Sequence, residues 1–436
     1  MSNPLAFGAR RLTLPFVVAF SALILGCATP PAGSPGTLRP ISFLAVGDTG
    51  YHYDYLEAED YEPPLTLQEF LAKERADWLE DHLPEADFQP SPAHVLASNG
   101  GVVAASGLDA VARAMRTWCE SRPCDFATML GDNIYPDGAT AGADGRDDDE
   151  RFRKLFIEPY GPLAESSADF RMYVTLGNHD WRTSLDGVLS QVRFHENTPP
   201  FFMDGFSYRA QPPVANGTVE LFVIDTEMLL SRVQVPETAV AADGSGALLE
   251  ELEAPKPWTR QQAAAGADGV AWLEAALASS TARWKIVMGH HPLWSTAGSK
   301  FAQAEALRRL ILPMLCRHAD LYLAGHEHTL ELHRDDCSVA TPDEGVPPLL
   351  QVVSGAGAKQ RPHHPAFSAW QQANNPQLET LYAKGMVWGF AHVELLDDQL
   401  RVRVVSTPND GSGLPVEEFT LLQPRRSGAS MRPVQR

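Results

Sequence analysis

Five short blocks that each join a glycine to metal-binding side chains recur along this chain, and every block follows an apolar run. The blocks are, in order, Gly47–Gly50 (GDTG), Gly131–Tyr135 (GDNIY), Gly177–Asp180 (GNHD), Gly289–Pro292 (GHHP) and Gly325–His328 (GHEH). The runs that precede them are Ile41–Val46, Phe126–Leu130, Met172–Leu176, Trp284–Met288 and Leu321–Ala324. Short apolar runs closed by glycine are typical of buried strands that turn sharply into a loop. Ligands at the ends of successive strands meet at one edge of a sheet, so the pattern predicts one site that binds two metal ions.

A two-metal site needs a ligand that bridges both ions and a matched set of ligands on each side. Asp132 is the natural bridge because a carboxylate has two oxygens. The other candidates divide between the ions as follows: Asp48 on the first, Asn178 and His290 on the second, and His326 and His328 one on each. Oxygen and nitrogen ligands without a thiolate suit iron, manganese and zinc.

Tyr135 is the unusual member of this set, since a phenolate is a hard ligand that favours a trivalent ion such as ferric iron. The alternative interpretation is a packing role, in which the ring lies under the loop and its hydroxyl bonds to the backbone. The sequence leaves both interpretations of Tyr135 open.

The five blocks together resemble those of the purple acid phosphatases, a group within the calcineurin-like metallophosphoesterases. That family carries GDxG, GDxxY, GNH, VxxH and GHxH blocks in this order, and this chain has GDTG, GDNIY, GNHD, VMGH and GHEH. Similarity to the small, tartrate-resistant branch extends to Gly289–Ser295 and Ser354–Gly357 and spans about Ile41 to Ser406. Most relatives outside the purple subgroup carry a histidine where this chain has Gly50 and lack a tyrosine at the place of Tyr135.

The resemblance implies a four-layer αββα sandwich with two mixed sheets flanked by helices, whereas periodicity alone indicates only a mixed α/β class. It implies a ferric site and a divalent site (iron, zinc or manganese), the first of Asp48, Asp132, Tyr135 and His328 and the second of Asp132, Asn178, His290 and His326. It also gives His179 a catalytic role, contacting the substrate phosphate and protonating the leaving group. One departure is that Ser295–Phe301, where small members place a second substrate-facing histidine, contains none.

The implied activity is an acid phosphatase, which hydrolyses small phosphomonoesters by attack of a metal-bound hydroxide at acidic to neutral pH. The nearest alternative keeps the metals and acts on phosphodiesters, nucleotides or phosphoanhydrides, because the fold and ligands are shared across those activities. A third possibility is a non-catalytic envelope lipoprotein that uses the fold for scaffolding. Such a protein would be expected to lose ligands, and all seven are present.

Three further polar features are interpreted as structural. His291 is next to a predicted ligand without matching the catalytic position of the family. Asp225 follows the strand-like run Leu221–Ile224 without a glycine and is expected to cap a loop or accept hydrogen bonds. The acidic run Asp147–Glu150 lacks the spacing of a calcium loop and is expected to cap a helix beginning near Arg151.

The N-terminal residues have the pattern of an export signal. Two arginines precede the apolar segment Leu12–Gly26, and Leu23–Cys27 resembles a bacterial lipobox. We therefore expect a signal peptide at residues 1–26, a Pro/Gly-rich tether at 27–40, a single catalytic domain at 41–423 and a disordered tail at 424–436. The expected location is periplasmic or outer-membrane-anchored, through lipid on Cys27, with simple cleavage of the signal as the alternative.

The cysteine content agrees with export, and the net charge limits the possible partners. Apart from Cys27, four cysteines remain, and of the three possible pairings the sequence-local one joins Cys119 to Cys124 and Cys316 to Cys337. Four reduced thiols are the alternative. The formal charge of −20 excludes nucleic-acid binding through bulk electrostatics, because the chain would repel a phosphate backbone.

The remaining patterns predict secondary structure between and after the blocks. Helices are expected at Leu65–Leu83, Ser106–Glu120, Gly269–Ser279 and Gln303–Cys316, and strands at Leu349–Val353, Val387–Leu396 and Leu400–Ser406. The last two strands should form an antiparallel hairpin. The segments Tyr51–Pro92, Thr140–Glu150 and Val233–Gly269 read as insertions that form part of the rim over the site.

Overall fold

The computed structural model describes residues 39–57, 61–143, 145, 147–265 and 268–426, all within one compact unit that starts at Arg39. The predicted signal peptide, Cys27, most of the tether and residues 427–436 lie outside the described residues. The described chain continues three residues into the expected tail, to Arg426, whose guanidinium donates to the Leu315 carbonyl at 3.1 Å. Within the described ranges, no helix is both long and apolar enough to span a bilayer.

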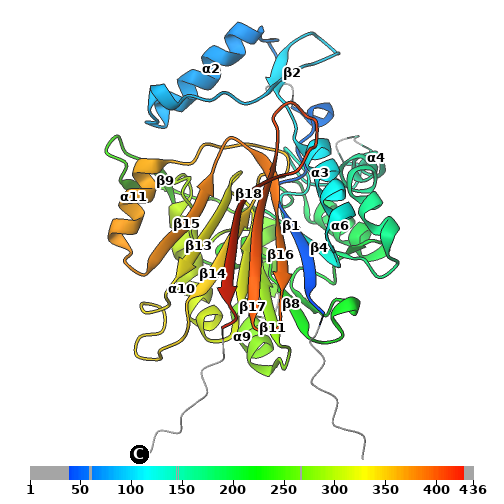
Figure 1. The fold of residues 1–436 in the computed structure, drawn as a ribbon. Helices are drawn as coiled ribbons and strands as arrows, with labels where there is room; N and C mark the ends of the chain where they lie inside the picture. The colour runs from blue at the N-terminus through cyan, green and yellow to red at the C-terminus, as the bar shows by residue number, and fades with distance from the viewer. Residues whose placement is uncertain (1–38, 58–60, 144, 146, 266–267, 427–436) are drawn as a thin grey trace, which may run out of the picture. The chain divides into compact units, whose positions relative to one another are not determined.

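Two seven-stranded mixed sheets form the centre of this unit (Figure 1). The first contains, in spatial order, β18 (Val416–Pro424), β17 (Gln399–Thr407), β16 (Trp388–Leu395), β1 (Ile41–Val46), β4 (Phe126–Leu130), β5 (Met172–Thr175) and β6 (Phe201–Phe202). The second contains β15 (Leu378–Lys384), β13 (Leu330–Asp335), β14 (Leu349–Ser354), β12 (Leu321–Ala324), β11 (Trp284–Met288), β8 (Val219–Val223) and β7 (Tyr208–Ala210). Two separate hairpins pair β2 (Ala93–Val95) with β3 (Val102–Ala104) and β9 (Pro236–Val240) with β10 (Gly246–Leu252).

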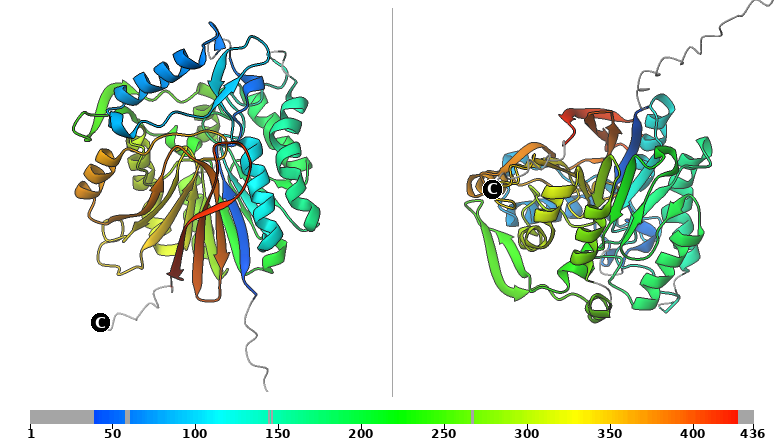
Figure 2. Two further views of the ribbon diagram at one scale, coloured as in Figure 1. Left: turned by 45° about the horizontal axis from the view of Figure 1, so that its top comes forward. Right: turned by 90° about the horizontal axis from the view of Figure 1, so that it is seen from below.

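Most helices flank the two sheets, whereas α2 (Leu67–Glu80) lies beyond the ends of the strands, at the top of Figure 1; Figure 2 gives two further views. The α-helices are α2 (Leu67–Glu80), α3 (Leu108–Ser121), α4 (Asp148–Phe152), α5 (Glu158–Tyr160), α6 (Leu185–Asn197), α7 (Thr226–Leu230), α8 (Pro257–Ala265), α9 (Gly269–Ser279), α10 (Phe301–His318) and α11 (Pro365–Asn374). Shorter turns of other helix types are η1 (Tyr53–Tyr55), η2 (Glu85–Asp87), η3 (Arg153–Ile157), η4 (Gly161–Ser166) and η5 (Pro213–Ala215). The layering is the two-sheet sandwich flanked by helices that the resemblance implied.

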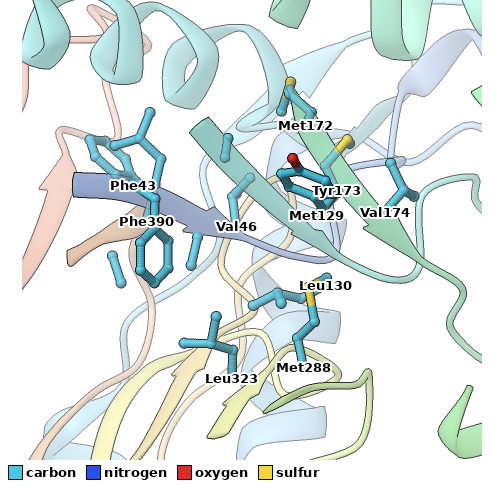
Figure 3. Close-up of a cluster of buried hydrophobic side chains, with 14 of the residues drawn as sticks. Phe43, Val46, Met129, Leu130, Met172, Tyr173, Val174, Met288, Leu323 and Phe390 are labelled. Atoms are coloured by element: carbon cyan, nitrogen blue, oxygen red, sulfur yellow. The ribbon is translucent and has the colours of Figure 1, made fainter. Parts of the chain in front are cut away.

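The two sheets share one buried apolar core (Figure 3). Leu130 of β4 belongs to the same cluster as Met288 of β11 and Leu323 of β12, so side chains from both sheets fill one interior. The strands that carry the blocks run parallel in each sheet: β1 pairs with β4 and β4 with β5, while β11 pairs with β12. Parallel strands bring their carboxyl ends, and hence the five blocks, to one edge of each sheet.

The ends of the two sheets also approach each other closely at the site. A β-carbon added to Gly47, after β1, would lie 3.2 Å from the α-carbon of Gly325, after β12. A side chain at position 47 would crowd this approach, which glycine leaves open. The glycines of the blocks therefore permit contact between the sheets as well as sharp turns.

Most of the elements expected from the pattern are present. The runs Ile41–Val46, Phe126–Leu130, Trp284–Met288 and Leu321–Ala324 are strands with those bounds, and β16 and β17 form the antiparallel hairpin. Asp225 accepts a hydrogen bond from the Met228 amide at 2.9 Å as the cap of α7, and Asp147 caps α4. Disulfides join Cys119 to Cys124 and Cys316 to Cys337, which is the sequence-local pairing.

Candidate metal centre

Three of the residues predicted to bind metal adopt a left-handed backbone conformation. The φ angles are 56° at Asp48, 51° at Asp132 and 70° at His326, each one residue after a strand-ending glycine. Such angles are uncommon and carry an energetic cost for residues other than glycine, and they concentrate at functional sites. The backbone after β1, β4 and β12 is therefore strained at the positions that turn these side chains into the site.

One group of predicted ligands surrounds the hydroxyl of Tyr135. The Tyr135 Oη atom lies 2.9 Å from Asp132 Oδ2, 3.0 Å from Asp48 Oδ1 and 3.2 Å from His328 Nε2. His328 Nε2 is itself 3.5 Å from Asp48 Oδ1. The hydroxyl points into a buried cluster of electron-pair donors, so the alternative in which it bonds only to backbone does not describe this arrangement.

A second group surrounds the side-chain oxygen of Asn178. Its Oδ1 atom lies 3.1 Å from His290 Nε2 and 3.0 Å from His326 Nδ1, and those two nitrogens are 3.1 Å apart. Asp132, His290 and His326 together offer ligand atoms within 4.8 Å of one another, a spacing that one metal ion can bridge.

Asp132 connects the two groups. Its Oδ2 faces Tyr135 at 2.9 Å, while its Oδ1 lies 3.4 Å from His290 Nε2. One carboxylate thus presents an oxygen to each group, as a bridging ligand between two ions would. The structure brings all seven predicted metal ligands into this pair of adjoining groups.

The hydrogen-bonding roles of His290 and Asn178 in the second group fit a cation site. His290 Nδ1 lies 2.8 Å from the Leu130 carbonyl and must donate to it, so in the neutral ring Nε2 carries a lone pair. That lone pair faces Asn178 Oδ1, which also accepts only. Against the effect of burial, the charge of Asp132 raises the pKa of His290 to about 10, so without a metal a proton on Nε2 lies between these atoms. A metal ion can take the place of that proton, so these residues fit a bound cation.

The pKa values of three predicted ligands of the first group are also consistent with a cation site. Burial, reinforced by the charge of Asp132, raises the pKa of Asp48 to about 8. Burial and the two carboxylates raise the pKa of Tyr135 well above its ordinary value, and burial lowers the pKa of His328 well below its own. Cations bound among these groups would favour the ionised carboxylate and phenolate, and so offset the cost of ionising Asp48 and Tyr135. The lowered pKa of His328 already keeps its imidazole neutral, as a metal ligand must be.

His179 lies beside both groups. Its backbone amide donates to Asp132 Oδ1 at 2.8 Å, and its ring centroid is 4.2 Å from that of Tyr135. Its Nδ1 lies 2.5 Å from the Pro136 carbonyl and donates to it, which leaves Nε2 available, 3.9 Å from Asp132 Oδ2. Burial lowers the pKa of His179 to about 4.

Two supporting residues were not singled out by the sequence pattern. Buried Asp180 accepts from the amide of Gly177 at 2.8 Å and from the amide of Asn133 at 3.1 Å, which ties the second and third blocks together. Thr226 Oγ1 accepts from the amides of His290 and His291 at 3.2 and 3.0 Å. Neither has a metal-type spacing; only the GNHD motif, which contains Asp180, offered a signal.

The fourth block and its continuation contain no second histidine facing the site. His291 is buried, and its Nδ1 pairs with Thr226 Oγ1 at 2.8 Å, which is a structural role. Within Ser295–Phe301, the Ser299 hydroxyl accepts a hydrogen bond from Arg361 Nη1 at 3.2 Å. Arg361 also forms an ion pair with buried Glu327.

Comparison with known proteins agrees with the fold and identifies the family. The sequence profile described as calcineurin-like phosphoesterase matches residues 41–330. The chain therefore belongs to the calcineurin-like phosphoesterase family. This family and the relatives described below show that the chain is a metal-dependent phosphoester hydrolase.

Among its relatives are purple acid phosphatases. The chain is 25% identical over 298 residues to the tartrate-resistant acid phosphatase type 5 of Sus scrofa, covering 67% of this chain and 76% of that protein. It is 26% identical over 338 residues to purple acid phosphatase 4 of Arabidopsis thaliana, covering 76% and 86%. It is 28% identical over 253 residues to purple acid phosphatase 17 of Arabidopsis thaliana, covering 58% and 61%. This homology implies a binuclear metal centre.

The fold also matches a solved structure of distant sequence. The structure described as GAP50, the anchor in the inner membrane complex of Plasmodium, superposes with a TM-score of 0.53 at 15% identity. The match covers 89% of this chain and 90% of that one, so the shared fold extends over almost all of both.

Proposed function

We propose that this protein is an acid phosphatase that hydrolyses phosphomonoesters at a ferric–divalent metal centre. The ferric site would be formed by Asp48, Asp132, Tyr135 and His328, and the divalent site by Asp132, Asn178, His290 and His326. The observation that carries the proposal is the two-sided carboxylate of Asp132, with the Tyr135 hydroxyl at one oxygen and His290 at the other. Iron, zinc and manganese all suit the second set of ligands.

When bound, two ions would lower the pKa of a water molecule and neutralise charge on the phosphate. The protein residues then orient the substrate. His179 Nε2 faces Asp132 at 3.9 Å while Nδ1 is held by Pro136, so the ring can direct one nitrogen toward a phosphate or leaving-group oxygen. Protonated His179 would donate that proton to the leaving oxygen, and a phosphate dianion beside it favours the protonated ring.

The nearest rival function is hydrolysis of a phosphodiester, a nucleotide or a phosphoanhydride on the same centre. A substrate panel separates these cases: p-nitrophenyl phosphate, its bis ester, ATP and pyrophosphate are assayed with the iron-loaded protein at pH 5 to 7. We expect the highest kcat/KM for the monoester. A clear preference for the bis ester or for ATP would overturn the monoesterase assignment.

A scaffolding function is a rival of another class, since the fold by itself does not establish catalysis. Replacing Asp132 with alanine tests it, because that change removes the bridging oxygens from both groups. We expect Asp132→Ala to lose both ions, measured by elemental analysis, together with turnover. The control Asp204→Ala removes an exposed carboxylate and should retain both. A chain that binds no metal and has no turnover in either form would favour the scaffold.

We further propose export as a lipoprotein, with the signal at residues 1–26 and lipid on Cys27. The support is the apolar segment that ends in the lipobox-like Leu23–Cys27, together with two disulfides, which persist in oxidising compartments. Intact-mass analysis of the membrane fraction tests this. A lipid adduct on Cys27 that disappears in Cys27→Ala is expected, and an unmodified soluble mature chain would show simple cleavage instead.

A further inference from the structure

Cationic side chains stand close to the predicted ligands even though the whole chain carries a formal charge of −20. Most of those that are partly buried near the site are already neutralised by carboxylates. Arg361 pairs with Glu327, and Lys300 pairs with Glu237 and Glu253 at 3.1 and 3.2 Å. The charges of Arg361 and Lys300 are therefore already compensated by ion pairs within the protein.

Lys359 is different because its ammonium faces aromatic rings. Its Nζ atom lies 4.8 Å from the ring centroid of Tyr135 and 5.4 Å from that of Tyr51. Among the described residues, no carboxylate lies within ion-pair distance of this half-buried ammonium. Ring faces compensate a cation only partly, so the ammonium retains its capacity to bind an anion.

The loop that carries Lys359 is fastened to the metal-binding loops on both sides. The Ala358 amide donates to the Asp48 carbonyl at 3.0 Å, and the Arg361 amide donates to the His328 carbonyl at 3.1 Å. The backbone one residue before and two residues after Lys359 is thus joined to two predicted ligands. Such anchoring holds a flexible lysine stem at a fixed position beside the centre.

The position is also next to the predicted catalytic histidine. The rings of His179 and Tyr135 are 4.2 Å apart, and Lys359 Nζ lies over the Tyr135 ring. Lys359 and His179 therefore contact the same predicted ligand of the ferric site. A phosphate bound at the centre would lie within reach of both side chains.

We propose that Lys359 binds the substrate phosphate and makes the site selective for dianionic monoesters over monoanionic diesters. The inference rests on the proposed phosphatase function and names the residue that sets its substrate class. An ammonium interacts more strongly with a dianion than with a monoanion, and it forms charge-assisted hydrogen bonds with unesterified phosphate oxygens. A diester has one fewer such oxygen and half the charge, so it would gain less from Lys359.

The test compares full-length wild type with Lys359→Met and Lys359→Arg, all loaded with metal. The matched control is Lys154→Met, which removes a lysine that is already paired with Asp54 at 2.6 Å and lies near the Tyr55 ring. Three quantities are measured: kcat/KM for p-nitrophenyl phosphate and for its bis ester, the Kd of inorganic phosphate by calorimetry, and metal content.

We expect Lys359→Met to lower kcat/KM for the monoester by about tenfold or more, the scale of one hydrogen bond to a charged group. The bis ester should change by less than about threefold, and the Kd of phosphate should rise by about tenfold. Metal content should stay as in wild type. Lys359→Arg should recover most of the loss, and Lys154→Met should match wild type in every measurement.

Equal losses for both esters, or loss of metal, would overturn the inference by showing that Lys359 only supports the loop. An unchanged phosphate Kd in Lys359→Met would also overturn it. If metal-loaded wild type hydrolyses neither ester, the proposed function fails, and the phosphate-binding comparison still decides whether Lys359 binds the anion.

Discussion

A β-carbon added to Gly50 would lie 2.1 Å from the carbonyl carbon of Asn133, so no side chain fits between the first two blocks. The Gly50 amide donates to the Asp132 carbonyl, and the Gly50 carbonyl accepts from the Tyr135 amide, both at 3.2 Å. This close pairing excludes a histidine at position 50. It also brings Tyr135 to the place where its hydroxyl meets Asp48 at 3.0 Å.

We therefore expect Gly50→Ala to displace the loop that carries Asp132 and Tyr135. The change should lower the free energy of unfolding by about 1–3 kcal/mol, as overpacking does, and reduce metal content. Chemical denaturation and elemental analysis measure both effects. Gly161→Ala is the matched control because its nearest neighbour to the new β-carbon is 4.0 Å away. Full metal content in Gly50→Ala would contradict the steric argument.

The second prediction concerns the Tyr135 hydroxyl. A phenolate bound to ferric iron gives a visible absorption band, so the iron-loaded protein should be coloured, and Tyr135→Phe should lose both the band and affinity for the ferric ion. Phenylalanine keeps the ring that contacts His179. Visible spectra and iron content test this, with Tyr208→Phe as control for a buried tyrosine bonded to Val174 instead. Persistence of the band in Tyr135→Phe would exclude Tyr135 as its source.

Acid should destabilise the fold through His195. This histidine is buried beside the rings of Phe156 and Phe194, with no hydrogen-bond partner for either nitrogen among the described residues, and burial lowers its pKa to about 3. Between pH 6.5 and 3 the unfolded chain binds a proton that the folded chain does not, so the free energy of unfolding falls as pH falls. Above about pH 6.5 both states are neutral at this residue, and its contribution no longer changes.

Replacing His195 with leucine removes this linkage. Between pH 7 and pH 5, wild type should lose about 2 kcal/mol more unfolding free energy than His195→Leu, from 1.4 kcal/mol per unit of pKa difference. Denaturant titrations at the two pH values measure the free energy of unfolding of each protein. His82→Asn, which removes an exposed histidine at a positive φ of 57°, controls for loss of an imidazole. Parallel pH dependences for wild type and His195→Leu would refute the mechanism.

The two disulfides should contribute different amounts to the free energy of unfolding. Cys316–Cys337 closes a loop with a sequence separation of 21, whereas Cys119–Cys124 has a separation of 5. Loop-closure entropy then gives about 3 kcal/mol for the longer loop and about 2 kcal/mol for the shorter one. Unfolding of the two double-alanine variants measures each contribution. An equal or reversed order would mean that entropy of the unfolded chain does not dominate.

Much of the site was predictable because each predicted ligand lies two to five residues after the end of a strand. The bounds of β1 and β12 match the apolar runs, since a buried strand closed by glycine is a local property of the chain. The insertion at Val233–Gly269 was recognised only as a rim segment, and its β9–β10 hairpin was not predicted. That segment lacks the alternation that marks a strand, and its pairing becomes visible only in the folded chain.

The sequence by itself determined which residues are candidate metal ligands, the order in which they occur and the strands that carry them, because these depend on neighbouring residues. Tertiary structure decided which atoms meet. Tyr135 and His328 are 193 residues apart in the chain, and Asp48 accepts from the amide of His326 across 278 residues. The contacts of the two Asp132 oxygens and the position of Lys359 beside Tyr135 likewise depend on how the two sheets pack and how the loops at their ends contact each other. No local pattern encodes those distances, because they are set by contacts between segments far apart in sequence.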